Sequence, residues 1–439
     1  MRPDPTTYAA DSPSRLSDDT ERTGVSVHRI EGRIRTYVWG SRTALAELTG
    51  RPVPTAHPEA ELWFGAHPGA PCDLVDTGET LEQRITEDPV GQLGHAAGAN
   101  RLPFLLKLLA ADRALSLQAH PTLEQARIGY ARENAAGIAL DSAQRNYKDD
   151  NHKPELIVAL TPFEALAGFR PVERTQKLFA ALLEAGATEL DRYSSLLELG
   201  RDAAVQPDDS SGAELLRVLV TTWITVPAAR REILLSSVLG ACHVLTADSG
   251  TPSWMSDAAA AALDLSEQYP GDPGVLISLL LNHVVLAPGE AIFLSAGKLH
   301  AYLKGTGVEI MANSDNVLRG GLTSKHIDVP ELMKVMDFSA SENQVRTARA
   351  DGTYDIPVPE FGLRVLPDGG SVDLEGPAIV LVTDGDCTVS GQHVDGETVL
   401  RSGQAAWVPA DADRVIATGT GKFFIAMVGT PEAAGESVD

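Results

Sequence analysis

The chain has 439 residues, of which 43% are hydrophobic and 22% charged, a composition typical of a globular protein with about two or three domains. Asp and Glu number 60 against 36 Lys and Arg, so the formal net charge is 36 − 60 = −24, which argues against a nucleic-acid-binding protein because phosphate backbones are held by basic surfaces. Cys72, Cys242 and Cys387 lie far apart, which excludes a disulfide framework and a CxxC metal pair and favours buried thiols in a reducing cytoplasm.

Residues 1–24 are rich in Pro, Asp, Ser and Thr and have no apolar core behind a basic start, so they do not form a secretory signal. Such a composition buries too little surface to offset the entropy of ordering, and we expect a flexible extension here and a flexible tail over residues 431–439. No stretch of 18 apolar residues occurs, so membrane insertion is not expected either.

Residues 25–170 mix strand-like and helix-like segments. Short β-rich runs occur around Val27, over IRTYVW at 34–39 and over ELIVAL at 155–160, whereas residues 122–135 have the pattern of a helix. Residues 171–269 carry apolar side chains at three- and four-residue spacing, with Gly closing several runs, which predicts an inserted helical domain. From about residue 270 onward, short apolar runs separated by Gly, Pro and Asp return, so the rest of the chain is predicted to be mainly β.

An internal repeat links two parts of this β-rich region. Shifting LAPGEAIFLSAGKLHAYLKGTG (286–307) by 114 residues aligns it with LRSGQAAWVPADADRVIATGTG (400–421), so that Gly289 matches Gly403 and Phe293 matches Trp407. The pattern is that of a jelly-roll hairpin and predicts two such barrels, although chance similarity between two Gly-spaced hairpins is the alternative. His300 in the first copy corresponds to Arg414 in the second, so a metal bound by the first barrel would lack that ligand in the second.

Four polar residues are candidates for one metal site. Gln118 and His120 are two residues apart, so on a strand both side chains face the same way. Glu155 opens a strand after the polar run KDDNHKP, and His300 follows the first repeat hairpin. Two imidazoles and two oxygen ligands suit Zn²⁺ with room for a substrate oxygen, whereas each residue taken alone is typical of a hydrogen-bonded structural group.

Several long segments resemble one known family. LPFLLKLLAADRALSLQAHP, YKDDNHKPELIVALTPFEALAGFR, LSAGKLHAYLKGTGVEIMANSDNVLRGGLTSKHIDVPEL, WGS at 39–41 and ELWFGAHP at 61–68 resemble type I mannose-6-phosphate isomerase (phosphomannose isomerase) in content and order, over roughly residues 30–170 and 275–340. The resemblance implies two cupin-type jelly-roll domains with a helical insertion. It assigns residues 25–170 and 270–340 to a catalytic cupin domain, 171–269 to the insertion and 341–430 to a C-terminal cupin domain without metal ligands. It also implies one zinc ion per chain, held by Gln118, His120, Glu155 and His300.

The reaction implied by the resemblance is the interconversion of mannose 6-phosphate and fructose 6-phosphate, which moves a proton between C1 and C2 through a cis-enediol. The proton carrier must be a carboxylate, Lys or His near the metal, and the candidates are Glu309, Lys153 and His152. We favour Glu309, because a carboxylate desolvated inside a barrel has a raised pKa, although a salt-bridged strand residue is the alternative.

The remaining candidates would bind the substrate. Arg319 lies beside two glycines that allow its guanidinium to approach the substrate, and the family places a catalytically needed Arg here. A sugar phosphate entering a chain of charge −24 needs a local positive patch and hydroxyl acceptors. The substrate-binding candidates are Trp39, Glu61, Lys107, Ser116, Asp315 and Lys325.

Two other functions compete with this one. A different cupin enzyme, such as a sugar epimerase or an Fe(II) oxygenase, would use the same barrel, but Gln118 as a fourth ligand favours zinc over the two-His, one-carboxylate iron site. A non-catalytic sugar-phosphate-binding protein would be expected to have lost a ligand or Arg319, and none is substituted. We expect a cytoplasmic monomer that binds a small sugar phosphate, and neither nucleic acid nor a membrane. The sequence leaves the metabolic direction open, either towards GDP-mannose biosynthesis or towards mannose catabolism.

Overall fold

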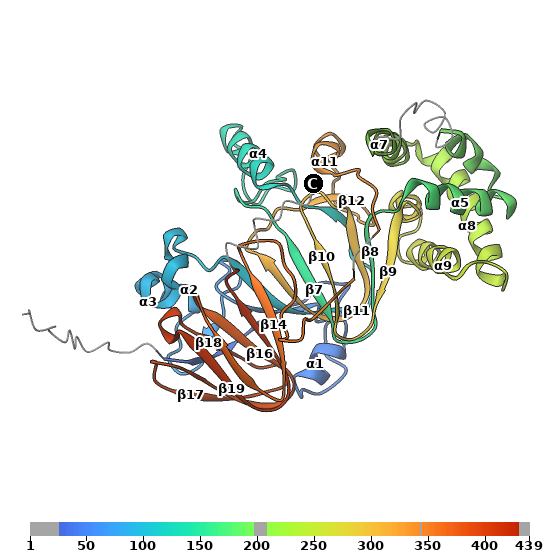
Figure 1. Ribbon diagram of the computed structural model, residues 1–439. Helices are drawn as coiled ribbons and strands as arrows, with labels where there is room; N and C mark the ends of the chain where they lie inside the picture. The colour runs from blue at the N-terminus through green and yellow to red at the C-terminus, as the bar shows by residue number, and fades with distance from the viewer. Residues whose placement is uncertain (1–25, 197–208, 343–344, 430–439) are drawn as a thin grey trace, which may run out of the picture.

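The computed structural model describes residues 26–196, 209–342 and 345–429, shown in colour in Figure 1. The predicted extensions at residues 1–24 and 431–439 lie outside these ranges. The described part of the chain is sheet-rich, with two β-sheets and a group of helices beside one of them (Figure 1). Among the helices of these ranges, none combines the length and the apolar character needed to span a bilayer.

The larger sheet forms two walls that share one strand. Its strands are β2 (Arg33–Arg35), β3 (Glu61–Phe64), β5 (Phe104–Ala111), β6 (Leu117–Ala119), β7 (Glu155–Ala159), β8 (Phe163–Phe169), β9 (Leu281–Leu286), β10 (Glu290–Leu294), β11 (His300–Ala312), β12 (Leu318–Gly321) and β13 (Arg346–Thr347). One wall has the order β13-β10-β7-β11-β5-β3-β2. In the other, β11 pairs with β6 and β8, β12 extends β6, and β9 extends β8. All the pairings are antiparallel, which agrees with the predicted hairpin-rich texture.

The second sheet contains the C-terminal strands together with two strands from the start of the chain. Its strands are β1 (His28–Glu31), β4 (Asp73–Leu74), β14 (Gly362–Pro367), β15 (Gly370–Asp373), β16 (Ala378–Gly391), β17 (Glu397–Arg401), β18 (Ala405–Val408) and β19 (Arg414–Met427). β1 lies between β18 and β4, so the first described strand extends the C-terminal sheet.

The internal repeat is confirmed as a structural repeat. β10 and β11 correspond, 114 residues later, to β18 and β19, and His300 and Arg414 are each the first residue of a long strand. Gly289 and Gly403 precede β10 and β18 with φ of 92° and 79°, values in the left-handed region that favour glycine. The two strands of each copy do not form the predicted hairpin, because they do not pair with each other. β10 and β11 each pair with β7, and β18 and β19 each pair with β16, so the repeat forms an equivalent three-strand arrangement in both sheets.

The predicted helical region is helical within its described residues. The helices of the described ranges include α1 (Ala44–Leu48), α2 (Leu81–Glu87), α3 (Pro89–Leu93), α4 (Leu123–Ala135), α5 (Val172–Glu184), α7 (Asp209–Thr225), α8 (Ala228–Ala247), α9 (Ser253–Gln268), α10 (Gly274–Ser278) and α11 (Val329–Val335), with short 3₁₀ turns η1 (Gly94–Ala99), η2 (Thr188–Leu190) and η3 (Ala410–Ala412). In α5 the buried residues Thr175, Leu178, Phe179 and Leu182 follow helical spacing. α5 and α7–α9 gather beside β8 and β9 (Figure 1).

The alternation of side chains along the strands places polar groups inside the space between the two walls. In β6, Leu117 and Ala119 pack on the helical cluster, which leaves Gln118 on the opposite face. In the other wall, residues such as Leu106 and Leu108 pack against the second sheet, which leaves Lys107 between them on the inner face. Both walls thus bury their outer apolar faces and turn their polar residues towards each other.

One predicted strand is shorter than expected. The run IRTYVW predicts a strand over 34–39, but β2 ends at Arg35. Beyond it the chain turns, with the Gly40 amide donating to the Tyr37 carbonyl, and the rings of Tyr37 and Trp39 stack 5.7 Å apart. The aromatic residues in this run serve packing at a turn rather than a β-ladder.

Candidate metal centre and active site

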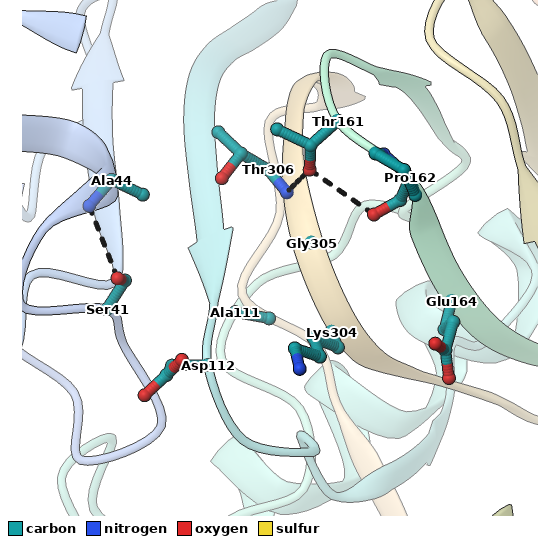
Figure 2. Close-up of a pocket in the computed structure, with 10 residues that line it drawn as sticks. All are labelled: Ser41, Ala44, Ala111, Asp112, Thr161, Pro162, Glu164, Lys304, Gly305 and Thr306. Atoms are coloured by element: carbon teal, nitrogen blue, oxygen red, sulfur yellow. Dashed lines mark hydrogen bonds between the residues drawn. The ribbon is translucent and has the colours of Figure 1, made fainter. Parts of the chain in front are cut away.

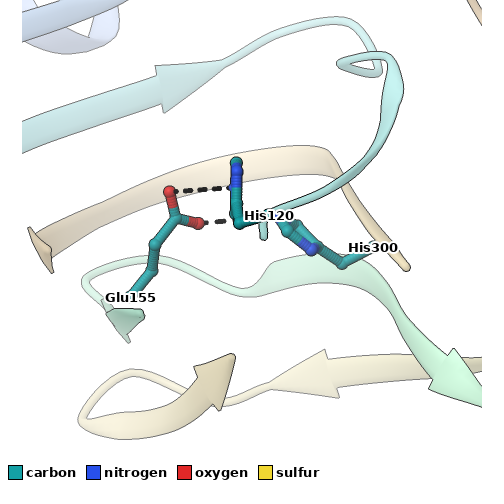
Figure 3. Close-up of side chains that lie close together, drawn as sticks. All are labelled: His120, Glu155 and His300. Carbon is teal, nitrogen blue, oxygen red and sulfur yellow. Dashed lines mark ion pairs between the residues drawn. The ribbon is translucent and has the colours of Figure 1, made fainter. Parts of the chain in front are cut away.

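Three buried side chains form a compact donor cluster between the two walls. His120 follows β6, Glu155 begins β7 and His300 begins β11, and all three are at most 1% exposed. Glu155 Oε1 lies 3.4 Å from His120 Nε2, and Glu155 Oε2 lies 3.5 Å from His300 Nε2. The three donor atoms lie within 4.8 Å of one another, and Figure 3 shows the carboxylate directed at the imidazoles. This is the separation at which one ion can bind all three.

The hydrogen bonds of the two imidazoles leave one nitrogen of each free. His120 Nδ1 lies 2.7 Å from the Asn316 carbonyl and His300 Nδ1 lies 2.8 Å from the Lys298 carbonyl. Because a carbonyl only accepts, each Nδ1 carries a proton and donates it, so Nε2 is the ring nitrogen left to bind a metal. Both Nε2 atoms and Glu155 Oε2 are buried without a hydrogen-bond partner among the described residues. Orphaned buried donor atoms of this kind fit a metal ion.

The electrostatics of the cluster favour the protonation states that bind metals. Burial, aided by the charge of Lys153, lowers the pKa of His120 to about 4, so the imidazole is neutral near pH 7. Burial opposes ionisation of Glu155, but Lys153 and His120 bring its pKa well below the usual value. Lys153 Nζ lies 2.5 Å from Glu155 Oε1. The cluster therefore offers a neutral imidazole at His120 and a carboxylate anion at Glu155.

Gln118 and Arg319 lie in register with His300 across the second wall. Gln118 is opposite His300 in the β6–β11 pair, and Arg319 is opposite Gln118 in the β12–β6 pair. Directly opposed residues of an antiparallel pair lie on the same face, so these three side chains share one face of the sheet. Ser116 precedes β6 two residues before Gln118. The inner face that carries His300 thus also carries Gln118 and Arg319.

A row of charged residues crosses the inner face of the first wall. Lys107 on β5 is opposite Glu309 on β11, and its Nζ lies 2.8 Å from Glu309 Oε2 and 3.4 Å from Glu61 Oε1. Burial favours the neutral amine, but Glu309 and Glu61 raise the pKa of Lys107, which keeps the ammonium charged. Burial raises the pKa of Glu309, Lys107 opposes this, and Glu155 adds to it. Two carboxylates sharing one ammonium make Glu309 a group that can take up a proton.

Four residues that the sequence analysis did not assign to the site also face it. Tyr302, two residues after His300, has a pKa raised by burial and by the charges of Glu309 and Glu155, and its hydroxyl has no hydrogen-bond partner in the part of the chain described. Trp63, two residues after Glu61, donates from Nε1 to Glu61 Oε2 at 2.9 Å. His67 lies 3.5 Å from Asp315 through Nε2. The period of two along a strand was the available signal for Tyr302 and Trp63. For His67 and Asn316, which follow strands, the signal was their place in segments that resemble the family.

Three cationic side chains, Arg319, Lys325 and Lys148, lie near one another where the phosphate is predicted to bind. Arg319 is half-buried, and burial lowers its pKa. The pKa of Lys325 is lowered chiefly by Arg319, then by burial and by Lys148, so these three cations are close enough to repel one another. A dianionic ligand would relieve this repulsion. Asp315 at the rim has a lowered pKa, because His67, Lys153 and Lys107 together outweigh its burial.

Two predicted residues make contacts elsewhere. His152 Nε2 lies 2.6 Å from Glu360 Oε1, so the described contacts of this imidazole lead to the C-terminal part of the chain. Trp39 packs against the apolar cluster that contains Leu115 and Tyr302, which places it beside the inner face without a polar contact to the site.

A separate pocket lies away from the metal cluster. Its volume is about 410 Å³, and it is bordered by α1, the turn between β7 and β8, and the middle of β11 (Figure 2). Asp112, Glu164 and Lys304 give it mixed charge. None of the described residues that line it belongs to the predicted site.

Taken together, a buried two-histidine, one-carboxylate donor set beside buried acid–base side chains defines a metal-dependent enzyme site. Residues 27–172 match the family model of the phosphomannose isomerase type I catalytic domain. The mannose-6-phosphate isomerase of Salmonella typhimurium is 38% identical over 90% of this chain and 98% of its own length. That of Rattus norvegicus is 34% identical over 86% and 92%.

Solved structures agree with these sequence comparisons. A crystal structure of zinc-bound mannose 6-phosphate isomerase superimposes with a TM-score of 0.79 at 35% identity, covering 92% of this chain and all of the other. The chain belongs to the type I mannose-6-phosphate isomerase family.

Proposed function

We propose that this chain is a zinc-dependent isomerase that interconverts mannose 6-phosphate and fructose 6-phosphate. The observation that carries the proposal is the buried His120–Glu155–His300 donor set next to the Glu309–Lys107 pair, in a chain 38% identical over nearly its whole length to an enzyme of that name. Gln118, in register with His300, would complete the ligand set. Bound zinc would act as a Lewis acid that stabilises negative charge on substrate oxygens without redox chemistry.

The residues around the donor set suit the proton transfer that this reaction requires. A proton must leave C2 of the aldose and arrive at C1, with negative charge developing on oxygen in between. Glu309 would hold that proton, because burial raises its pKa towards neutrality and Lys107 stabilises the anion once the proton has moved on. Lys153, 2.5 Å from Glu155, is the second candidate for proton transfer. His152 is a weaker candidate because its Nε2 contacts Glu360.

Of the remaining candidates, one set would bind the phosphate of the substrate and another set would bind its sugar hydroxyls. Arg319 and Lys325 would bind the phosphate together with Lys148 and the Ser116 hydroxyl, since the three cations already lie near one another. Glu61 and Asp315 would accept sugar hydroxyls, and Trp39 would contact the sugar face. This division orients the substrate with its carbons 1 and 2 towards the buried carboxylates.

We further propose that both sheets are cupin-type jelly rolls, with residues 25–170 and 270–340 forming the catalytic domain, 171–269 a helical insertion and 341–430 a C-terminal domain. The repeat of β10–β11 as β18–β19 supports two related barrels. Because β1 and β4 pair within the C-terminal sheet, the two domains would share strands. We also propose that the enzyme is a cytoplasmic monomer and binds no nucleic acid, which its charge of −24 supports.

A coupled assay of the purified chain with mannose 6-phosphate, before and after chelation and zinc add-back, tests the function. We expect turnover that the chelator abolishes and zinc restores. A folded, zinc-loaded chain without turnover would rule out the proposal and would favour a non-catalytic sugar-phosphate-binding protein.

A further inference from the structure

Asn316 is a fully buried residue in the loop between β11 and β12, and it contacts a predicted metal ligand through its backbone. Its carbonyl accepts the Nδ1 proton of His120 at 2.7 Å. This bond selects the tautomer of His120 and directs its Nε2 towards Glu155. The direction of the imidazole therefore depends on where the backbone of residue 316 is held.

The side chain of Asn316 holds that backbone by binding a second segment of chain. Its Oδ1 accepts from the Lys148 amide at 2.7 Å, and its Nδ2 donates to the Asp149 carbonyl at 2.9 Å and to the Asn151 carbonyl at 2.8 Å. Nδ2 also lies 3.1 Å from Asp149 Oδ1, and Oδ1 lies 3.3 Å from the Asp149 amide. The amide thus uses its full hydrogen-bonding capacity on residues 148–151.

Residues 148–151 lead directly into the other half of the metal cluster. Lys153 and Glu155 follow within four residues of Asn151, and their side chains form the 2.5 Å ion pair. A single side chain therefore joins the segment that supplies Glu155 to the carbonyl that orients His120. Those two ligands come from separate strands, β7 and the end of β6. β11 pairs with both strands, and Asn316 adds a direct link between the two ligand segments.

We propose that Asn316 is the positioning residue of the metal centre, setting the relative placement of His120 and Glu155 and so the affinity for the metal. The inference rests on the proposed function only in taking zinc as the metal. An aspartate in its place would keep the acceptor oxygens but lose both N–H donors, and would set a carboxylate against Asp149. No other side chain of this size offers two donors and an acceptor in the same plane.

Zinc affinity of the full-length Asn316→Ala variant, measured by competition with a chromophoric chelator, tests this directly. Loss of a partner that orients a ligand typically weakens metal binding by roughly 10- to 100-fold, and we expect a loss of that size. The matched control is Gln92→Ala, which also truncates a buried amide, one that accepts from Trp407 Nε1 at 2.8 Å between α3 and β18. The control should lower thermal stability while leaving zinc affinity within twofold of the wild type.

A second variant decides the question if Asn316→Ala does not fold. Ser314 Oγ donates to Asp149 Oδ1 at 2.8 Å and accepts from the Asn316 amide at 3.2 Å, so Ser314→Ala weakens the same junction more mildly. We expect several-fold weaker zinc binding. ¹⁵N NMR of the histidines should also show His120 protonated at Nδ1 in the metal-free wild type and a mixture of tautomers in the variants.

The outcomes separate this proposal from the proposed function. Wild-type zinc affinity in folded Asn316→Ala, or in Ser314→Ala where the former is unfolded, would overturn the positioning role even if the wild type is an active isomerase. An equal loss in Gln92→Ala would overturn it too, because the effect would then be general destabilisation. Weakened zinc binding in the Asn316 variant alone, in a chain without isomerase activity, would support the positioning role and reject the function.

Discussion

At the scale of single residues, the inner faces of the two walls carry charges that an apolar core would exclude. Burying an ionised side chain is costly unless it is paired, and Lys107, Glu309 and Glu61 are paired with one another. Within the described ranges, His120 Nε2, His300 Nε2 and Glu155 Oε2 lack a hydrogen-bond partner. The free-energy cost of burying polar atoms without partners is therefore concentrated at the atoms that would bind the metal, which is typical of a functional site.

The role of Glu309 is testable by an isosteric change. Glu309→Gln removes the group that would carry the proton but keeps an oxygen near Lys107, so we expect exchange of the substrate C2 proton with solvent to slow by about 10²- to 10⁴-fold. The exchange is measured by NMR in deuterated buffer. Glu61→Gln, which alters the other carboxylate of Lys107, is the control and should affect KM more than exchange. Normal exchange in Glu309→Gln would transfer the role to Lys153 or His152.

Arg319 gives a second residue-scale prediction. Arg319→Ala removes the guanidinium on the face shared with Gln118 and His300, so we expect kcat/KM to fall by about 10²- to 10³-fold while zinc stays bound. Arg319→Lys keeps the charge without the bidentate geometry and should recover part of the loss. Steady-state kinetics measures kcat/KM of both variants, and atomic emission measures their zinc content. Unchanged turnover in Arg319→Ala would remove Arg319 from the site.

At the scale of elements, β11 determines the shape of the site because it belongs to both walls. Its first residues pair with β6 and β8, and from Gly305 onward it pairs with β5 and β7. At Gly305 the backbone has φ of 126°, and an added Cβ would lie 2.7 Å from the Pro162 carbonyl oxygen. His300 and Glu309 can therefore face the same interior although they pair with different strands.

A glycine substitution tests this turning point. Gly305→Ala forces a side chain into a left-handed, crowded position, and we expect a loss of about 1–3 kcal/mol in the free energy of unfolding. Gly240→Ala is the opposite control, since that glycine lies in the middle of α8 with open space around it, and alanine there should stabilise by about 0.5–1 kcal/mol. Urea denaturation measures both. Equal stability of the two variants would contradict this account of β11.

At the scale of the whole molecule, the two sheets share one apolar core. Leu106, Leu108 and Val308 of the larger sheet pack in the same cluster as Trp407 and Phe424 of the second sheet. The contact between His152, just before β7, and Glu360, just before β14, crosses the same boundary. The second sheet thus supports the wall that carries Lys107 and Glu155, so loss of either sheet would destabilise the site.

Metal binding should stabilise the whole chain, because the three orphaned donor atoms acquire a partner only in the folded state. At free zinc about 100-fold above its Kd, we expect an increase of about 2.7 kcal/mol in the free energy of unfolding. Calorimetry of the chelated chain with and without zinc measures it. His300→Ala should abolish most of the increase, whereas His283→Ala, which alters a histidine paired with Glu164, should keep it. A zinc-induced increase that survives in His300→Ala would place the ion elsewhere.

The metal-free chain should lose stability in mild acid. The pKa of His120 is about 4 in the folded state and near 6.5 when unfolded, so between these values the unfolded chain binds a proton that the folded chain does not. The free energy of unfolding therefore falls as the pH is lowered from about 6.5 to about 4, by roughly 3 kcal/mol from this residue. Urea denaturation at several pH values, for the chelated wild type and for His120→Gln, should show a shallower pH dependence in the variant. Identical slopes would mean that His120 does not titrate in this way.

The sequence by itself determined the sheet-rich fold with its helical stretch, the repeat, the family and the donor residues. These depend on local patterns, such as the apolar run of β7 and the glycines at 289 and 403, and such patterns can be identified without knowing the path of the rest of the chain. It overextended the strand at 34–39, because the stacking of Tyr37 on Trp39 depends on the path of the turn.

Only the tertiary structure decided which polar residues meet. Asn316 binds residues 148–151 from more than 160 positions away, and His152 contacts Glu360 rather than the metal cluster. Contacts between distant segments arise from strand order and from the bend of β11, and no local pattern encodes them. The residue types of this site determine which chemistry it can perform, whereas its geometry arises from the pairing of strands that are far apart in the chain.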